Sequence, residues 1–444
     1  MSTNISFKHI NKLAVPALIS GVSEPILSLT DAAIVGNIAF NATESLAAVG
    51  IVTTFLSMLI WVLGQTRSAI SSIVSQYVGA NKLDKIKNLP AQAIFIITSL
   101  SVLIILGTYP FANFIFKLYN ASGLILDYSV DYYRIRVFGF PFTLFTIAVF
   151  GAFRGLQNTY YPMLIAIIGT ITNIVLDVVL VYGIEGYITP MNLEGAAYAS
   201  VIAQFLMAIF SAYYLLKKTV IPLKLSFPFN KEINRFILMI LNLFVRTIAL
   251  NVTLYYASAF ATSYGATYIA AYTIAINLWF LGAFIVDGYA SAGNILSGKL
   301  YGGKEYPLLI TLSNKLIKYG VIVGVLIAVI GGVLYYPIGN LFTNDPEVLK
   351  QFYNIFWIVL AMQPLCTIAF IFDGIFKGLG KMKALRNVLL AATFLVFVPV
   401  LFWLDALDYK LYAIFIALTL WIIARGFPLI FIFRKIFIPL SKIN

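Results

Sequence analysis

Residues 151–156 read Gly-Ala-Phe-Arg-Gly-Leu, and residues 374–379 read Gly-Ile-Phe-Lys-Gly-Leu, so one pattern returns 223 positions later. A second block, nearer the N-terminus, keeps the same offset. In it, three small residues have identical counterparts: Ser68, Ala69 and Gly79 correspond to Ser291, Ala292 and Gly302. Two separate blocks in one register indicate an internal repeat. We therefore expect the chain to consist of two equivalent halves.

The composition indicates a membrane protein. Of the 444 residues, 61% are hydrophobic and 11% are charged, whereas soluble domains contain about 45–50% apolar and about 25% charged residues. A transmembrane helix needs about 20 apolar residues, and the first apolar segment is long enough to be a span rather than a signal peptide. Twelve spans are predicted, at about 12–38, 46–79, 91–117, 128–156, 161–183, 194–217, 232–263, 267–300, 309–341, 347–379, 384–404 and 410–437.

Six spans separate equivalent positions of the repeat, so both halves have the same orientation in the membrane. The predicted fold is an all-α polytopic membrane protein whose twelve helices form two parallel-repeat six-helix bundles, an architecture typical of transporters. The expected organisation is an N-terminal lobe over 1–218, a cytoplasmic linker over 219–231 and a C-terminal lobe over 232–444.

Charged residues sort by loop. Lysines and arginines gather near 82–87, 217–235, 381–386 and 434–442, whereas the alternate loops carry acids near 44, 127, 185, 345–347 and 405–408. The positive-inside rule then places both termini in the cytoplasm. The net charge of +13 is explained by this topology, so we expect no nucleic-acid partner.

Acidic residues inside the apolar spans are the first candidates for function. Asp31 lies in the apolar run 13–40, where a charged side chain is costly and needs a partner, water or an ion. At 1.5 Å per residue, Asp31 and Asp177 lie at a similar depth, roughly 10 Å below the outer ends of their spans. Asn173 is one turn from Asp177, and Thr170 continues the same stripe. These oxygens suit Na⁺, or a pair of acids that shares one proton; carboxylates that only line a wet vestibule are the alternative.

Four further charges lie at depth in the spans. Glu24 and Arg67 are at matched depth in the first half, as are Arg246 and Asp287 in the second. A lone buried arginine would be costly, so we expect one ion pair in each lobe, Glu24 with Arg67 and Arg246 with Asp287.

Other features of the spans are weaker signals. Pro16 and Pro25 each free a backbone carbonyl of the first span and favour a bend there. Asp373 and Lys377, at i and i+4, form a local helix pair. Five polar residues could line a cavity: Tyr133, Gln204, Asn251, Tyr255 and Asn277.

Several classes of chemistry find no support in the chain. His9 and Cys366 are the single histidine and the single cysteine, which argues against a metal site, and there is no Walker motif or nucleophile–base pair. We expect a transporter rather than an enzyme, with no metal and no cofactor apart from a coupling ion.

Several motifs resemble those of multidrug and toxic compound extrusion (MATE) transporters. They are Ser-Glu-Pro-Ile-Leu-Ser-Leu-Thr-Asp-Ala-Ala-Ile-Val-Gly at 23–36, the stretch 151–162, Asn-Ile-Val-Leu-Asp at 173–177 and Leu-Glu-Gly-Ala-Ala-Tyr-Ala at 193–199. Three more resemble the DinF-like branch: Arg246-Thr247, Asp287-Gly288 and Asp-Gly-Ile-Phe at 373–376.

The resemblance implies a V of two six-helix bundles that exports organic compounds by alternating access, driven by inward H⁺ or Na⁺. It also implies that Asp31, Asn173 and Asp177 form a cation site whose loading accompanies bending of the first helix. Glu24 stands where the family often has an uncharged residue, and adds a titratable group. A seventh-helix glutamate known in another branch is replaced by Arg246-Thr247, so that second site is not expected here.

The expected protein is a monomer in the cytoplasmic membrane, with a small organic substrate and contacts to membrane lipid. Three alternatives remain. A flippase for a lipid-linked saccharide belongs to the same superfamily but favours a more basic cavity. A membrane-embedded transferase would need an acid–base or metal set. A major-facilitator fold would need an Asp-Arg-rich motif after span two, which 79–84 lacks.

Overall fold

The computed structural model describes residues 5–38 and 40–442, and within them the side chains of residues 24, 25, 28 and 29 are not described. The first half contains α1 (Phe7–Val35), α2 (Ala42–Leu63), α3 (Thr66–Gly79), η1 (Leu83–Ile86), α4 (Leu89–Thr108), α5 (Ala112–Leu118), α6 (Gly123–Arg136), η2 (Val137–Gly139), α7 (Phe140–Gly155), α8 (Tyr160–Tyr182) and α9 (Asn192–Lys218). The second half contains α10 (Ile233–Ser263), α11 (Ala266–Gly302), α12 (Tyr306–Val333), α13 (Tyr335–Phe342), α14 (Pro346–Gly378), α15 (Met382–Ala391), the π-helical turn η3 (Ala392–Phe397), α16 (Val398–Ala406) and α17 (Leu411–Ser441).

The protein is a multi-pass membrane protein. Eleven of the described helical segments are long and apolar enough to cross a bilayer, and each corresponds to one of the predicted spans. The remaining predicted span is α1, whose 29 residues extend about 43 Å at 1.5 Å per residue, more than the roughly 30 Å of a hydrocarbon core. The described residues contain helices and no strand, so the predicted all-α fold is confirmed.

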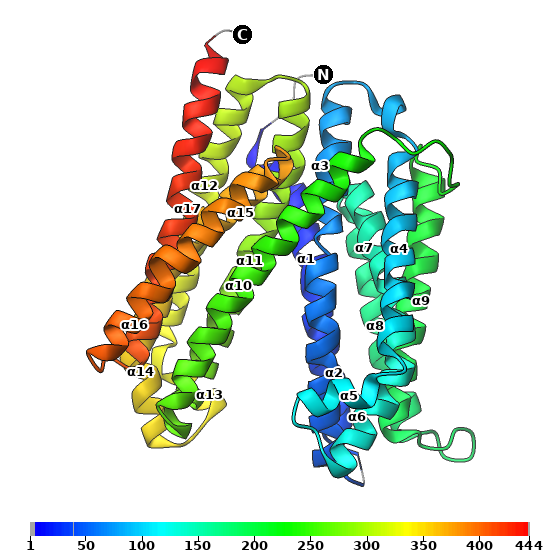
Figure 1. Ribbon diagram of the computed structural model, residues 1–444, viewed down its shortest axis with the longest axis vertical. Coiled ribbons are helices and arrows are strands. Elements are labelled where there is room, and N and C mark those ends of the chain that lie inside the picture. Colours follow the sequence, from blue (N-terminus) through cyan, green and yellow to red (C-terminus); the bar gives the residue numbers. More distant parts are fainter. Residues whose placement is uncertain (1–4, 39, 443–444) are drawn as a thin grey trace. The chain divides into compact units, whose positions relative to one another are not determined.

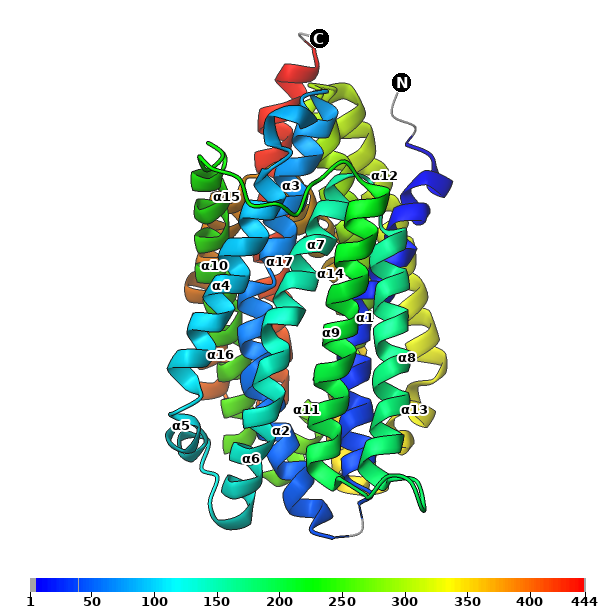
Figure 2. The same cartoon turned by 90° about the vertical axis from the view of Figure 1, so that its right-hand side faces the viewer.

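Packing divides the chain into two compact units. One contains residues 19–74 and 82–240, and the other contains residues 1–18, 75–81 and 241–444. The predicted lobe boundaries, 1–218 and 232–444, differ from these units mainly in the start of α1 and the end of α3, which group with the C-terminal half. In the first unit α8 and α9 lie side by side (Figure 2). In the second, α14 packs along α11 and also contacts α12 and α17 (Figure 1).

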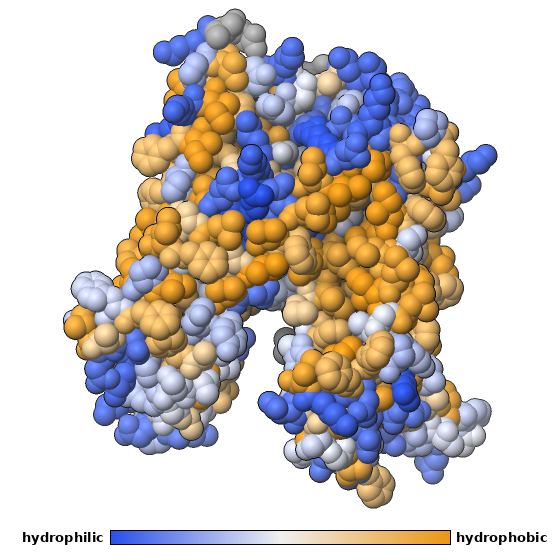
Figure 3. Space-filling view, viewed as in Figure 1, coloured by the Kyte–Doolittle hydropathy of each residue, from blue (hydrophilic) through white to orange (hydrophobic). Residues whose placement is uncertain are grey.

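On the face shown in Figure 3, apolar side chains gather over the middle of the long helices of each unit, and hydrophilic side chains gather towards the helix ends. An apolar middle with polar ends is the distribution that a bilayer requires of helices whose side chains face lipid.

The internal repeat is visible in helix packing. A Cβ on Gly151 would lie 2.7 Å from the carbonyl oxygen of Arg67, and a Cβ on Gly374 would lie 2.0 Å from that of Ala290. Both members of the second pair stand 223 positions after those of the first. Only glycine permits so close an approach of two helices, so α7 crosses α3 as α14 crosses α11.

The same equivalence recurs one turn further along. A Cβ on Gly155 would lie 2.5 Å from Cβ of Val74, and a Cβ on Gly378 would lie 2.1 Å from Oγ of Ser297, again with an offset of 223. The repeat predicted from the sequence is therefore confirmed as a repeated helix crossing within each unit.

The predicted linker between the two halves, residues 219–231, is hydrogen-bonded to α4 and to the turn before it. The side chain of Gln92, near the start of α4, accepts from the backbone N–H of Asn230 at 2.8 Å and donates to the carbonyl of Ser226 at 2.7 Å. Asn230 in turn donates to the carbonyl of Lys85 at 2.9 Å. The predicted linker is thus irregular in structure but held by specific hydrogen bonds.

Candidate functional site

A buried group of acids and amides lies in the first unit, between α1, α8 and α9. Asp31 of α1 is 2% exposed, and Asp177 of α8 is fully buried. The hydroxyl of Ser200, on α9, donates to Oδ2 of Asp31 at 3.0 Å and accepts from the amide of Asn173 at 3.3 Å. The structure therefore brings together Asp31, Asn173 and Asp177, as the sequence predicted. Ser200, which the sequence analysis did not select, connects them.

The two carboxyl groups are neighbours. Asp31 and Asp177 lie within hydrogen-bonding reach of each other. Two ionised carboxylates can only accept hydrogen bonds, so this contact is bonding only when one of them carries a proton or when a cation lies between them. Two like charges this close in a low dielectric repel strongly, so the arrangement favours uptake of one positive charge.

Several oxygens of this group have no hydrogen-bond partner among the described residues. They are buried, and they comprise Asp31 Oδ1, Asn173 Oδ1, both carboxyl oxygens of Asp177 and Thr170 Oγ1. Buried polar atoms are normally satisfied, because leaving one without a partner costs about 1–3 kcal/mol. Hard oxygens that lack donors are the ligands that a proton or Na⁺ would satisfy.

Glycines let α8 and α9 approach closely enough to form this site. A Cβ on Gly195 would lie 2.7 Å from the carbonyl oxygen of Leu180, and a Cβ on Gly169 would lie 2.2 Å from the sulfur of Met207. Because Asn173 and Asp177 are four residues apart, they share the face of α8 that is turned towards α9.

A positively charged side chain, Arg136, lies near the two carboxyl groups. Arg136, at the end of α6, interacts electrostatically with both Asp31 and Asp177, and its Nη1 donates to Oε1 of Gln204 at 2.9 Å. Gln204, which was predicted to face the transport cavity, lines a pocket of the first unit, and a role in transport stays a prediction. The pocket is lined from α2, α6, α7 and α9 by Thr53, Leu56, Ser57, Ile60, Arg136, Phe140, Thr143 and Gln204.

The predicted bend and ion pair of the first helix are not decided by the structure. The side chains of Glu24 and Pro25 lie outside the described residues, so the Glu24–Arg67 pair stays a prediction. Helix α1 is continuous from Phe7 to Val35 and runs through the half-buried Pro16. Arg67 is half-buried on α3.

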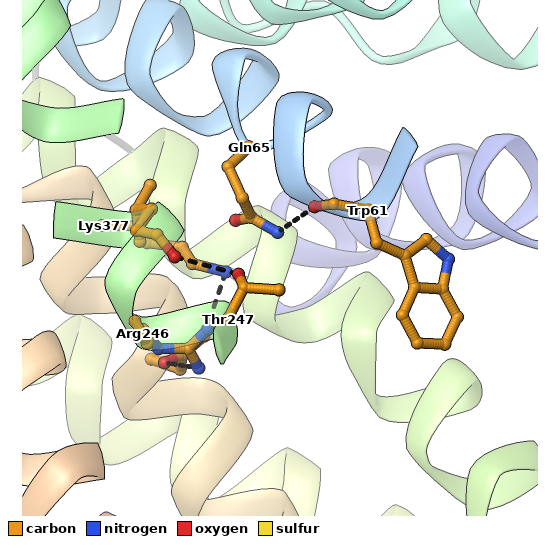
Figure 4. Close-up of polar contacts among 7 residues, drawn as sticks. Trp61, Gln65, Arg246, Thr247 and Lys377 are labelled. Atoms are coloured by element: carbon orange, nitrogen blue, oxygen red, sulfur yellow. Dashed lines mark hydrogen bonds and ion pairs between the residues drawn. The ribbon is translucent and has the colours of Figure 1, made fainter. Parts of the chain in front are cut away.

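The predicted ion pair of the second unit is wrong in its partner. Arg246, on α10, donates from Nη2 to Oδ1 of Asp373 on α14 at 2.5 Å. Figure 4 labels Arg246 and Lys377 of this group. Asp287 is half-buried and forms none of the ion pairs found in the described part of the chain. The predicted local pair of Asp373 with Lys377 is confirmed, with Nζ 3.0 Å from Oδ2.

A further arginine completes this group. Arg425, in the middle of α17, is 4% exposed, and its guanidinium lies over the rings of Trp421 at 4.8 Å and Phe370 at 5.1 Å. It interacts electrostatically with both Arg246 and Asp373. Arg425 was not among the predicted residues, although a charge in the middle of an apolar span is a recognisable signal.

The remaining predicted cavity residues have different environments. Tyr133 is wrong as a cavity residue: it is fully buried, its hydroxyl donates to Thr108 at 2.6 Å and its ring packs against Phe55 and Phe116. Three others stay predictions. The side-chain amides of Asn251 and Asn277 donate to carbonyls of their own helices. Tyr255 is 70% exposed. Neither the hydrogen bonds nor the exposure identify a cavity.

A family model matches most of the chain. The model named MatE covers residues 16–179 and 243–403, one segment in each half. The chain belongs to the MatE family. Members of this family are membrane transporters and not enzymes, as the absence of a catalytic set in the sequence had suggested.

Individual relatives are distant but extend over most of the chain. The DNA damage-inducible protein F of Escherichia coli K12 is 25% identical over 440 residues, covering 97% of this chain and 92% of its own. The multidrug export protein MepA of Staphylococcus aureus is 23% identical, covering 90% and 88%. A crystal structure of MATE in the bent conformation has a TM-score of 0.90 at 21% identity, over 98% of this chain and 96% of its own, and shows that the fold is shared.

Proposed function

We propose that this MatE-family chain is a cation-coupled antiporter that exports small organic compounds across the cytoplasmic membrane by alternating access, driven by inward H⁺ or Na⁺. The observation that carries the proposal is the buried pair Asp31 and Asp177: three of its four carboxyl oxygens have no donor among the described residues, and the fourth, Oδ2 of Asp31, accepts from Ser200.

The charge balance supports coupling to one monovalent cation. Asp31 and Asp177 together bring two negative charges, and Arg136 brings one positive charge. One proton or one Na⁺ therefore neutralises the group, and its release leaves a buried net negative charge. A group that is stable in only one loading state is suited to bias a conformational equilibrium.

Relatives support the direction of transport and the mechanism. MepA is described as a multidrug export protein, and one solved structure with a TM-score of 0.86 is described as an outward-facing conformation of a multidrug resistance MATE family transporter. For the present chain we propose that loading of Asp31 and Asp177 is linked to movement of α1, with Pro16 and Pro25 as the places where that helix bends. Both termini are proposed to be cytoplasmic.

The test is efflux of a fluorescent organic cation from proteoliposomes under an imposed pH gradient or an imposed Na⁺ gradient. We expect one gradient to drive efflux by the wild type, and Asp31→Asn and Asp177→Asn to lower the driven rate at least tenfold. Asp127→Asn, which changes an exposed carboxylate on α6, should transport like the wild type. Driven efflux that survives both buried substitutions would remove the acid pair from the mechanism.

A second candidate is a flippase for a lipid-linked saccharide, and the observation that favours it is the additional buried cation Arg425 near Arg246. Transfer of a fluorescent lipid-linked saccharide between leaflets, with no gradient-driven export of the organic cation, would favour this candidate over the antiporter.

A further inference from the structure

The charged group of the second unit contains more cations than its carboxylate can balance. Arg246, Lys377 and Arg425 bring three positive charges, and Asp373 brings one negative charge, so the group has a net charge of +2. Arg246, Arg425 and Asp373 are buried, and Lys377 is half-buried. Burying charge without a counterion is costly, so a group of this kind is stabilised by an anion.

The contacts leave hydrogen-bond donors available. Asp373 uses one oxygen for Nη2 of Arg246 and the other for Nζ of Lys377. A guanidinium has five N–H donors and an ammonium has three. Within the described part of the chain, Arg246 and Lys377 form no other hydrogen bond. The other guanidinium nitrogens of Arg246 are not among the fully buried atoms without a partner, so they reach accessible space, and the side chain of Lys377 is 16% exposed.

Arg425 has the most hydrogen-bond donors that no acceptor uses. Among the described residues its guanidinium takes part in no hydrogen bond or ion pair, only in the ring contacts with Trp421 and Phe370. Contact with two rings restrains the guanidinium, and its N–H groups have no hydrogen-bond acceptor among the described residues. A fixed planar edge with parallel N–H groups is the arrangement that binds a carboxylate or a phosphate through two oxygens.

We propose that Arg425, together with Arg246 and Lys377, binds an oxyanion group, a carboxylate or a phosphate, of the compound that the protein transports. The inference rests on the proposed transport function and adds a substrate class to it: the transported compound carries at least one negative charge. A singly charged carboxylate lowers the net charge of the group to +1, and a doubly charged phosphate or dicarboxylate neutralises it.

The matching positions of the first unit lack this arrangement. The counterpart of Lys377, at the offset of 223, is Arg154, which donates to the hydroxyl of Ser20 at 3.1 Å. The counterpart of Asp373 is Phe150. The positive group is therefore a property of the second unit and not a general feature of the repeated helix crossing.

The test is direct binding to the full-length protein. The wild type is reconstituted in nanodiscs of phosphatidylcholine, in a buffer whose only other anion is methanesulfonate, and titrated calorimetrically with succinate and with inorganic phosphate. We expect saturable binding of at least one probe at one site per chain. Arg425→Gln should weaken this binding at least tenfold. Arg434→Gln, which removes an exposed arginine from the same helix, should leave it unchanged.

Two further measurements guard against misfolding and identify the source of the oxyanion. Arg425→Lys keeps the charge but not the planar edge, and should bind more weakly than the wild type and more tightly than Arg425→Gln while eluting as the same monodisperse species.

Nanodiscs containing phosphatidylglycerol should lower the apparent affinity for the probes if a lipid headgroup is the ligand, and leave it unchanged if the ligand is soluble.

Absence of saturable binding of both probes to the wild type, or equal binding by Arg425→Gln, would overturn the proposal. Export of radiolabelled succinate and phosphate, and of the organic cation, by the wild type is measured in parallel under the imposed H⁺ and Na⁺ gradients. Gradient-driven export without anion binding would reject the oxyanion site alone, and anion binding without gradient-driven export of any of these compounds would reject the proposed antiport alone.

Discussion

A Cβ placed on Gly151 would lie 2.7 Å from the carbonyl oxygen of Arg67, so α7 and α3 approach each other at a distance that only a glycine tolerates. The same relation holds between Gly374 and Ala290 in the other unit. These two crossings hold the cores of the units, and they can be tested before any transport assay.

We expect Gly374→Ala to destabilise the protein, because the added methyl would meet backbone at 2.0 Å, and overpacking of this kind costs about 1–3 kcal/mol. The measurement is the thermal unfolding midpoint in detergent. Gly107→Ala, in α4, adds the same methyl where no atom lies within 4 Å. It should raise the midpoint slightly, since alanine favours helix by about 1 kcal/mol over glycine. Equal midpoints for both variants would contradict the close crossing.

We expect Ser200→Ala to change the ion dependence of efflux without abolishing efflux. The substitution removes the hydrogen bond to Asp31 and the acceptor of Asn173, and a hydrogen bond to a charged group contributes about 1.5–3 kcal/mol. The concentration of the coupling ion that gives half-maximal efflux should therefore shift by about one to two orders of magnitude. It should rise if the ion is Na⁺, which loses a positioned carboxylate, and fall if the ion is H⁺, because the hydroxyl stabilises the ionised form of Asp31. Ser200→Thr keeps the hydroxyl and should resemble the wild type. An unchanged half-maximal concentration in Ser200→Ala would place Ser200 outside the ion site.

We expect Arg246→Gln to be strongly destabilising. It leaves the buried Asp373 with only Lys377 within ion-pair distance, and removing one partner of a buried pair costs about 3–5 kcal/mol. The double variant Arg246→Gln/Asp373→Asn should recover part of the lost stability, because no uncompensated carboxylate remains. Arg235→Gln, which breaks a partly exposed pair with Glu232 at the start of α10, should cost about 0–1 kcal/mol. Equal loss in the single and double variants would argue against a direct ion pair.

We expect the contact between Tyr264 and Asp405 to raise the free energy of unfolding, and this contribution to be lost at alkaline pH. The hydroxyl of Tyr264, in the turn between α10 and α11, donates to Oδ1 of Asp405 at 2.5 Å. Burial, followed by the contact with this carboxylate, raises the pKa of Tyr264. A raised pKa means that the folded state holds the proton more tightly, so the contribution is complete below the unfolded tyrosine pKa of about 10 and disappears as the pH rises through the folded pKa.

The difference in unfolding midpoint between the wild type and Tyr264→Phe measures this term. The difference should be constant from pH 7 to about 9 and should shrink above about 10, where unfolded tyrosine ionises. A difference that does not change with pH would show that the hydroxyl contributes only through packing.

The spacing of residues along one helix was readable from the sequence, but the direction of each side chain around the helix axis was not. Asn173 and Asp177 could be placed on one face because they are four residues apart, and Asp31 could be placed at their depth by counting residues. Counting residues placed Asp287 at the depth of Arg246 and Asp373 nearer the end of its span, yet the partner of Arg246 is Asp373, because the pairing depends on how α10 is rotated against α14. That rotation is set by side-chain packing across 127 residues of sequence, which no local pattern records.

Two other outcomes have the same origin. Tyr133 carries a polar atom in mid-span, and sequence alone does not show that Thr108 satisfies it within an aromatic core. Ser200 looked like one small residue among many in α9, and only the fold places its hydroxyl between Asp31 and Asn173.

The repeated glycine crossing also bears on the evolution of the protein. Two halves that keep the same contact at the same offset are what the duplication and fusion of one gene would produce. A homodimer of that ancestral half would have presented identical side chains at both crossings. Equivalent positions now hold different residues, Phe150 in the first half and Asp373 in the second. Such a difference can arise only when the two copies mutate separately. Fusion into one chain thus allowed an acidic centre and a basic centre to evolve on the same scaffold.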